Sequence, residues 1–227
     1  AFAAAMTYHH TSSAALGMLA GAGAGLLVAT LQANMSHRLT ADQFVVGLTL
    51  NILVLGLTGF FAGEFAPTSE KLANVEIPLL VDLPLLGPAL FGQPWPLYLI
   101  YAVAPAAWWL VYRTRWGLEV RSVGEDPQAA DVSGIKVNLR RRQTIYLAGL
   151  TSGLGGAYFL LAVTGRFEDS MIGGRGFIAI VAVIFGGWTL KGTVAGCVLF
   201  GAVLSFRLSL PQQGYELNNE LLSAMPY

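Results

Sequence analysis

The sequence predicts an all-α fold, a polytopic bundle of transmembrane helices. Of its 227 residues, 55% are hydrophobic and 11% are charged, which is too apolar for a soluble domain. Apolar runs of about 20 residues, the length that crosses a hydrocarbon core of ~30 Å, recur between short polar turns. We therefore expect residues 1–227 to form a single domain in a lipid bilayer. The net charge of zero argues against a nucleic-acid binder.

The first complete span is expected at residues 14–34. Residues 1–8 have the composition of the end of a preceding helix, and the chain finishes equally abruptly, so we expect a fragment that lacks terminal helices. One face of the span carries a glycine at every fourth position: Gly17, Gly21 and Gly25. This spacing lets another helix approach closely. The paired histidines His9 and His10 have no further ligand nearby in sequence, so no metal site is expected.

The second span is expected at residues 44–63, with Thr49 and Asn51 at mid-depth. An amide in lipid needs a partner, so Asn51 should face the protein interior. There it would bind a neighbouring helix or line a substrate path. Residues 64–96 then form a proline-rich extracytoplasmic cap, because Pro78, Pro84 and Pro88 forbid a regular lipid-facing helix. A third span, at 97–112, has aromatic residues at its ends.

The long polar run at residues 113–143 is expected to be cytoplasmic, because it holds seven of the thirteen basic residues and Lys and Arg beside membrane spans stay inside. A short helix of about two turns is expected within it. Asp126 is suited to the N-cap, Pro127 to the first turn and Gly134 to the stop. Its small-residue face would comprise Ala129, Ala130 and Ser133. This helix either docks on a cytoplasmic partner or is a surface turn packed on its own protein.

A fourth span, expected at 144–164, is again rich in small residues. Its Ser152 has no histidine or acid to complete a catalytic relay, so no enzyme activity is expected. Residues 165–176 would return to the outer side. The apolar segments 177–185 and 193–206 are each short for a span, and would form two short spans or a re-entrant hairpin. Residues 208–227 are expected to be an outer amphipathic stretch.

Four segments in order carry a resemblance to a known family. They read TADQFVVGLTLNILVLGLTGFF, GLEVRSVGEDPQAADVSGIKV, TSGLGGAYFLL and GGRGFIAIVAVIFGGWTLKGTVAG. Together they resemble ABC importer permeases of the branched-chain amino acid, ribose and nucleoside group, and within it the subunits that work with Bmp-type nucleoside-binding lipoproteins. The resemblance implies that an ATPase-coupling helix lies at Gly124, Glu125, Asp126, Pro127, Ala129, Ala130 and Gly134. Candidates for the translocation path are Thr49, Asn51, Gly174, Gly176 and Phe177.

The resemblance also implies a setting. It implies a multi-pass protein of the bacterial cytoplasmic membrane, paired with a second permease subunit as a homo- or heterodimer. Cytoplasmic ATP-binding subunits would drive it, an extracytoplasmic solute-binding protein would deliver a nucleoside or simple sugar, and no cofactor would be needed. The alternatives are an ion-coupled secondary transporter, which the break at residues 186–192 keeps open, and an intramembrane enzyme. Every acidic residue falls in a loop or at a span end, which argues against the enzyme.

Overall fold

The computed structural model describes residues 1–38, 41–65, 71–72, 74–76, 91–168 and 171–212. These fall into two compact units, Ala1–Met171 and Ile172–Tyr227. In the described part of the chain, four helices are long and apolar enough to cross a membrane: Ala14–Ser36, Gln43–Phe65, Trp95–Arg113 and Val137–Thr164. The all-helical transmembrane fold and its four expected spans are therefore confirmed.

The first unit opens with a helical hairpin of α1 (Phe2–Thr11) and α2 (Ala14–Arg38). Ser12 joins them in the left-handed conformation at φ 51°, and the Ser13 hydroxyl accepts a hydrogen bond from the Leu16 amide at 3.5 Å. His9 and His10 are exposed. Among the described residues there is no group of three or more side chains that could hold a metal ion.

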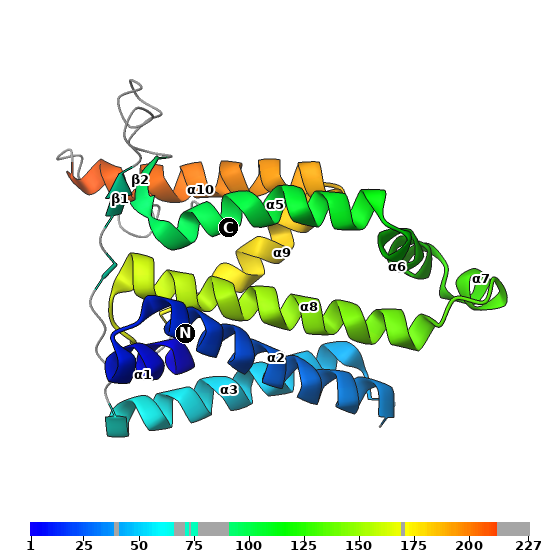
Figure 1. Ribbon diagram of the computed structural model, residues 1–227, viewed down its shortest axis with the longest axis horizontal. Helices are drawn as coiled ribbons and strands as arrows, with labels where there is room; N and C mark the ends of the chain where they lie inside the picture. Colours follow the sequence, from blue (N-terminus) through cyan, green and yellow to red (C-terminus); the bar gives the residue numbers. More distant parts are fainter. Residues whose placement is uncertain (39–40, 66–70, 73, 77–90, 169–170, 213–227) are drawn as a thin grey trace. The chain divides into compact units, whose positions relative to one another are not determined.

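The most extensive helix contact among the described residues of the unit joins α2 to α8 (Val137–Tyr158), which run side by side (Figure 1). A Cβ atom at Gly25 would overlap the carbonyl oxygen of Gly149, and one at Gly153 would overlap that of Gly21. Backbone therefore meets backbone, as the spacing of the glycines predicts. At one end of this contact α1 completes a buried cluster: Ala4, Ala5, Met18, Ala157, Leu160 and Leu161.

The last turns of the fourth span form a π-helix, η1 (Phe159–Thr164), which was not predicted from sequence. Gly165 donates its amide to the Leu160 carbonyl, five residues back, at 2.7 Å. The wide turn leaves the Leu161 carbonyl free, and the Leu72 amide donates to it at 3.0 Å. A buried carbonyl needs such a partner. The segment after the second span is thereby fastened to the end of α8.

The second span is α3 (Gln43–Phe65), and the Asp42 carboxylate caps it by accepting from the amides of Phe44 and Val45. The cap expected at residues 64–96 is described in part. Strands β1 (Asn74–Glu76) and β2 (Gly92–Pro94) pair in antiparallel register. The helix-breaking prolines at 78, 84 and 88 lie outside the described residues.

The polar run at 113–143 is mostly helical, which corrects the expected loop. The third span, α5 (Trp95–Arg113), leads into α6 (Arg115–Glu125) and then α7 (Pro127–Val132). Helix α8 begins at Val137, two turns before the expected start at residue 144. The physical reason is that Arg140, Arg141 and Arg142 extend the helix beyond the apolar span, where polar side chains are solvated. Figure 1 shows α6 and α7 beyond the end of α5.

The second unit is a hairpin of α9 (Arg175–Phe185) and α10 (Leu190–Gln212). Its turn places Gly187 at φ 60° and Trp188 at φ 57°. Gly186 and Gly192 touch through their backbones, so neither has room for a Cβ. At 11 residues α9 is too short to cross ~30 Å, whereas α10, at 23 residues, is long enough and runs beyond the expected end at 206. The described start of the expected outer stretch, 208–212, belongs to α10.

The α2–α8 contact gives a matched pair of variants within one helix. Gly25→Ala places a methyl group in the backbone of α8, an overpacking penalty of roughly 1–3 kcal/mol. Gly23→Ala places the same group where nothing lies within 4 Å, and should be neutral or stabilise by about 0.5–1 kcal/mol. Thermal unfolding of the purified protein in detergent should show a lower Tm for Gly25→Ala alone. Equal Tm values for the two variants would contradict the contact.

Candidate functional site

The short helix α7 begins and ends as predicted. The Asp126 carboxylate accepts hydrogen bonds from the amides of Gln128 and Ala129 at 2.9 and 3.1 Å, and Pro127 occupies the first turn. At the other end Gly134 adopts φ 83°, and the Ile135 amide donates to the Ala130 carbonyl at 3.0 Å. Both ends of the six-residue helix are therefore closed by hydrogen bonds, as a helix of this length requires.

One of the two alanines expected on the small-residue face of α7 is buried instead of exposed. Ala130 is 4% exposed, and α7 contacts α6 and α8, so this side chain points inward. Consecutive residues of a helix are about 100° apart, so the two alanines cannot share a face. Gln128 and Asp131 are exposed, and so are Ala129, Ser133 and Val132, which share one face; Val132 is 91% exposed. The outer face therefore includes an apolar residue that was not singled out from sequence.

A polar network ties α6 to α8 behind α7. The Arg140 guanidinium forms an ion pair with Glu119 at 2.6 Å and donates to the Gln143 side-chain oxygen at 2.8 Å. The Trp116 indole donates to that same oxygen at 2.9 Å. Glu119 and Trp116 lie on α6, whereas Arg140 and Gln143 lie on α8. The two helices are thus joined by directed bonds as well as by packing.

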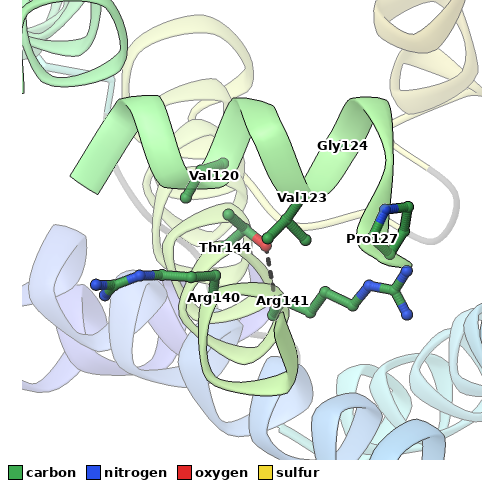
Figure 2. A pocket seen from close by; sticks show the side chains of 7 residues that line it. All are labelled: Val120, Val123, Gly124, Pro127, Arg140, Arg141 and Thr144. Carbon is green, nitrogen blue, oxygen red and sulfur yellow. Dashed lines mark hydrogen bonds between the residues drawn. The ribbon is translucent and has the colours of Figure 1, made fainter. Parts of the chain in front are cut away.

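A pocket of about 300 Å³ lies among the three helices (Figure 2). Val120 and Val123 project into it from α6, and Pro127 closes one side. The Arg141 guanidinium extends towards Pro127, and that of Arg140 points the opposite way. The complete lining is Val120, Val123, Gly124, Pro127, Arg140, Arg141 and Thr144. Helix α7 therefore packs against α6 and α8 on one side and borders the pocket on another.

The predicted coupling residues form one continuous feature. Gly124 and Glu125 are exposed at the end of α6, Asp126 caps both helices, and Gly134 ends the turn after α7. The network behind them was not predicted. The helix α6 that carries half of it could have been found, because Trp116, Val120 and Val123 recur at helical spacing within a run that reads as polar.

The path candidates of the first unit lie on α3. Thr49 is exposed, and its hydroxyl donates to the Val45 carbonyl of its own helix at 2.9 Å. Asn51 is also exposed, so its expected burial against a neighbouring helix is not found within the described chain. The physical reason is that α3 packs mainly on α2 and leaves most of its surface open. Thr49 and Asn51 are two positions apart on α3, so their side chains point in different directions.

The path candidates of the second unit gather at the start of α9. Gly174 is the N-cap residue at φ 75°, and its carbonyl accepts from the Phe177 amide at 2.8 Å. A Cβ at Gly176 would meet nothing within 4 Å, and Phe177 is exposed. Of Gly174 and Gly176, the first alone therefore has a backbone conformation that favours glycine.

Comparison with known proteins decides the family. The chain matches the family described as "Branched-chain amino acid transport system / permease component" over residues 1–225. It belongs to this family. Its four long apolar helices fit a multi-pass membrane protein, as the resemblance implied. No solved structure gives a significant match.

The similar proteins include transporters named for different solutes. The chain is 38% identical to the nucleoside ABC transporter permease protein NupC of Lactococcus lactis, over 84% of this chain and 62% of that protein. It is 34% identical to the guanosine ABC transporter permease protein NupQ of Bacillus subtilis, over 93% and 69%. It is 28% identical to the ribose import permease protein RbsC of Escherichia coli, over 85% and 57%. The chain thus spans between 57% and 69% of the length of these relatives.

The polar network gives a prediction with a neighbouring control. Arg140→Met removes the bonds to Glu119 and Gln143, which we expect to be worth about 1 kcal/mol because both partners of the ion pair are partly exposed. Arg141→Met removes a positive charge from the next residue of the same helix and serves as the control. Hydrogen exchange should speed up in α6 and α7 for Arg140→Met only. Equal exchange in the two variants would show that the network does not hold α6 in place.

Proposed function

We propose that this chain is a permease subunit of an ATP-driven ABC importer in the bacterial cytoplasmic membrane, and that it moves a nucleoside across the bilayer. The observation that carries the proposal is α7, a helix capped at both ends and held out between two membrane spans in a chain of this family. In this proposal a cytoplasmic ATP-binding subunit binds α7 and the flanking residues from Gly124 to Gly134.

The bonds around α7 give a physical route for coupling. Asp126 and Gly134 fix the two ends of the helix, and the buried Ala130 holds it against α6 and α8. The pair of Glu119 and Arg140 then joins α6 to the first turns of α8, which continues into the fourth span. A partner that pulls α7 on closing would therefore displace α8 instead of only bending a loop.

The outer face of α7 suits a close apolar contact. Ala129 and Ser133 are small and let another surface approach, and Val132 offers an apolar side chain that is 91% exposed. Burying a valine side chain contributes about 1.5–3 kcal/mol at most. We therefore propose that Val132 enters a groove of the ATP-binding subunit, with Ala129 and Ser133 lining the contact.

The proposed assembly also contains a second permease subunit, the same or different, and an extracytoplasmic solute-binding protein. The proposed solute path includes the five positions Thr49, Asn51, Gly174, Gly176 and Phe177. The exposure of Thr49, Asn51 and Phe177 in this chain supports their role, because exposed polar and aromatic groups are available to a path completed by another subunit.

The choice of a nucleoside rests on the relatives. The two proteins at 38% and 34% identity are named for nucleoside and guanosine transport. A putative glucose ABC transporter permease protein of Haloferax volcanii follows at 33%, and the ribose protein at 28%. A simple sugar is therefore the other solute to test.

Transport itself is the first test. Sealed vesicles that carry the complete transporter and its binding protein should accumulate labelled guanosine only when ATP reaches the ATP-binding subunits. An ionophore that collapses ion gradients should not reduce this uptake, and excess unlabelled ribose or glucose should not compete. Uptake that follows the ion gradient without ATP would indicate a secondary transporter. Competition by a sugar would overturn the nucleoside assignment and leave the importer intact.

The docking of α7 is tested by Ala129→Arg. A long charged side chain in a packed interface should cost roughly 1–3 kcal/mol or more, so the complex should lose ATP-binding subunits or hydrolyse ATP without transport. Asp126→Ala should have a smaller effect, since an N-cap is worth about 1 kcal/mol. Asn138→Arg adds the same side chain at an exposed site on α8 and serves as the control. Co-purification and coupled ATP hydrolysis are measured. Normal assembly and transport by Ala129→Arg would make α7 an ordinary surface turn.

A further inference from the structure

Two arginines at the junction of α5 and α6 lie against aromatic rings. The Arg113 guanidinium carbon is 5.5 Å from the centre of the Trp108 ring, and that of Arg121 is 5.1 Å from the centre of the Tyr112 ring. Both distances are within the range of a cation–π contact. The two rings are themselves neighbours, with centres 6.3 Å apart. The two cations therefore belong to one patch, which we call the junction patch: Trp108, Tyr112, Arg113 and Arg121.

Among the described residues, no acidic side chain neutralises the cations of the junction patch. In the described residues, the ion pairs join Arg140 to Glu119 and Arg166 to Glu168. Glu119 is the acidic residue nearest to Arg121 in sequence, and it is turned to α8. Arg113 and Arg121 are both exposed. A ring contact holds the plane of a guanidinium and leaves its N–H groups at the edge, where they are free to donate to an oxygen anion.

The junction patch lies at the end of a candidate membrane span, where lipid headgroups are expected. Arg113 is the last residue of the span Trp95–Arg113, so Trp108 and Tyr112 occupy its final turns. Helix α6 begins only two residues later and carries Leu118, which is 60% exposed and lies one turn from Arg121 on the same face. An exposed leucine beside arginines is typical of a helix that rests on a membrane, with its apolar group among acyl chains and its cations at the phosphates.

We propose that the junction patch binds the phosphate of an anionic phospholipid. Arg113 and Arg121 donate to the phosphate oxygens, Trp108 and Tyr112 hold the two guanidinium groups in position, and Leu118 contacts the acyl chains. The inference depends on the end of α5 and not on the docking of α7, so it stands apart from the transport proposal.

The test compares lipid binding by three forms of the full protein. Native mass spectrometry in detergent counts bound phosphatidylglycerol during a titration, with phosphatidylcholine as the neutral lipid. The variant Arg113→Gln with Arg121→Gln should bind phosphatidylglycerol about 25-fold more weakly than the parent, since each of the two cations near a membrane surface contributes about fivefold. The control Lys136→Gln with Arg141→Gln removes two exposed cations of the same polar run and should leave the binding unchanged.

Two further measurements distinguish lipid binding by guanidinium groups held on aromatic rings from the general attraction of positive charges to an anionic lipid. Arg113→Lys with Arg121→Lys keeps both charges but lacks the planar fork, so it should bind more weakly than the parent. Inorganic phosphate should not compete at concentrations where phosphatidylglycerol binds. The proposal is overturned if the parent shows no preference over phosphatidylcholine, if the control variant loses binding equally, or if inorganic phosphate competes. It is also overturned if the glutamine variant keeps its lipid and instead loses a partner subunit, because the patch would then be a protein contact.

Discussion

The backbone contact between α2 and α8 is the constraint on which the rest of the first unit depends. In a bilayer the hydrophobic effect does not drive helices together, so their association relies on close packing. Gly21, Gly25, Gly149 and Gly153 remove the side chains that would otherwise separate the two helices. With α8 fixed in this way, both of its ends become firm attachment points for segments that have little packing of their own.

The two ends of α8 use different chemistry for this purpose. At one end the π-helix frees the Leu161 carbonyl, which accepts from the Leu72 amide. At the other end Arg140 and Gln143 extend beyond the apolar span and hold α6 through Glu119 and Trp116. Helix α7 is then suspended between α6 and α8. The proposed coupling helix is short, but the elements that carry it lead directly to a membrane span that packs backbone to backbone on its neighbour.

The arginines of the polar run serve at least two structural purposes. Arg140 joins two helices through a carboxylate, whereas Arg113 and Arg121 lie on aromatic rings at the end of a span. A planar guanidinium suits both arrangements, because it can bond at its edge while its face is packed. Basic composition alone predicts that this run is cytoplasmic. The partners of the individual arginines show that Arg140 joins two helices, whereas Arg113 and Arg121 form a cationic surface.

The sequence by itself determined the features that depend on local chemistry. Apolar length predicted the four spans, glycine spacing predicted the packed face of α2, and Asp126, Pro127 and Gly134 predicted the start and stop of α7, because each signal acts within a few residues. The tertiary structure decided which face of α7 is open, burying Ala130 and exposing Val132. It also decided that Trp116 and Glu119 join the helix at residues 115–125 to α8, and that Asn51 is exposed on this chain. These outcomes depend on which helices come together across more than twenty positions of sequence, and no local pattern records that choice.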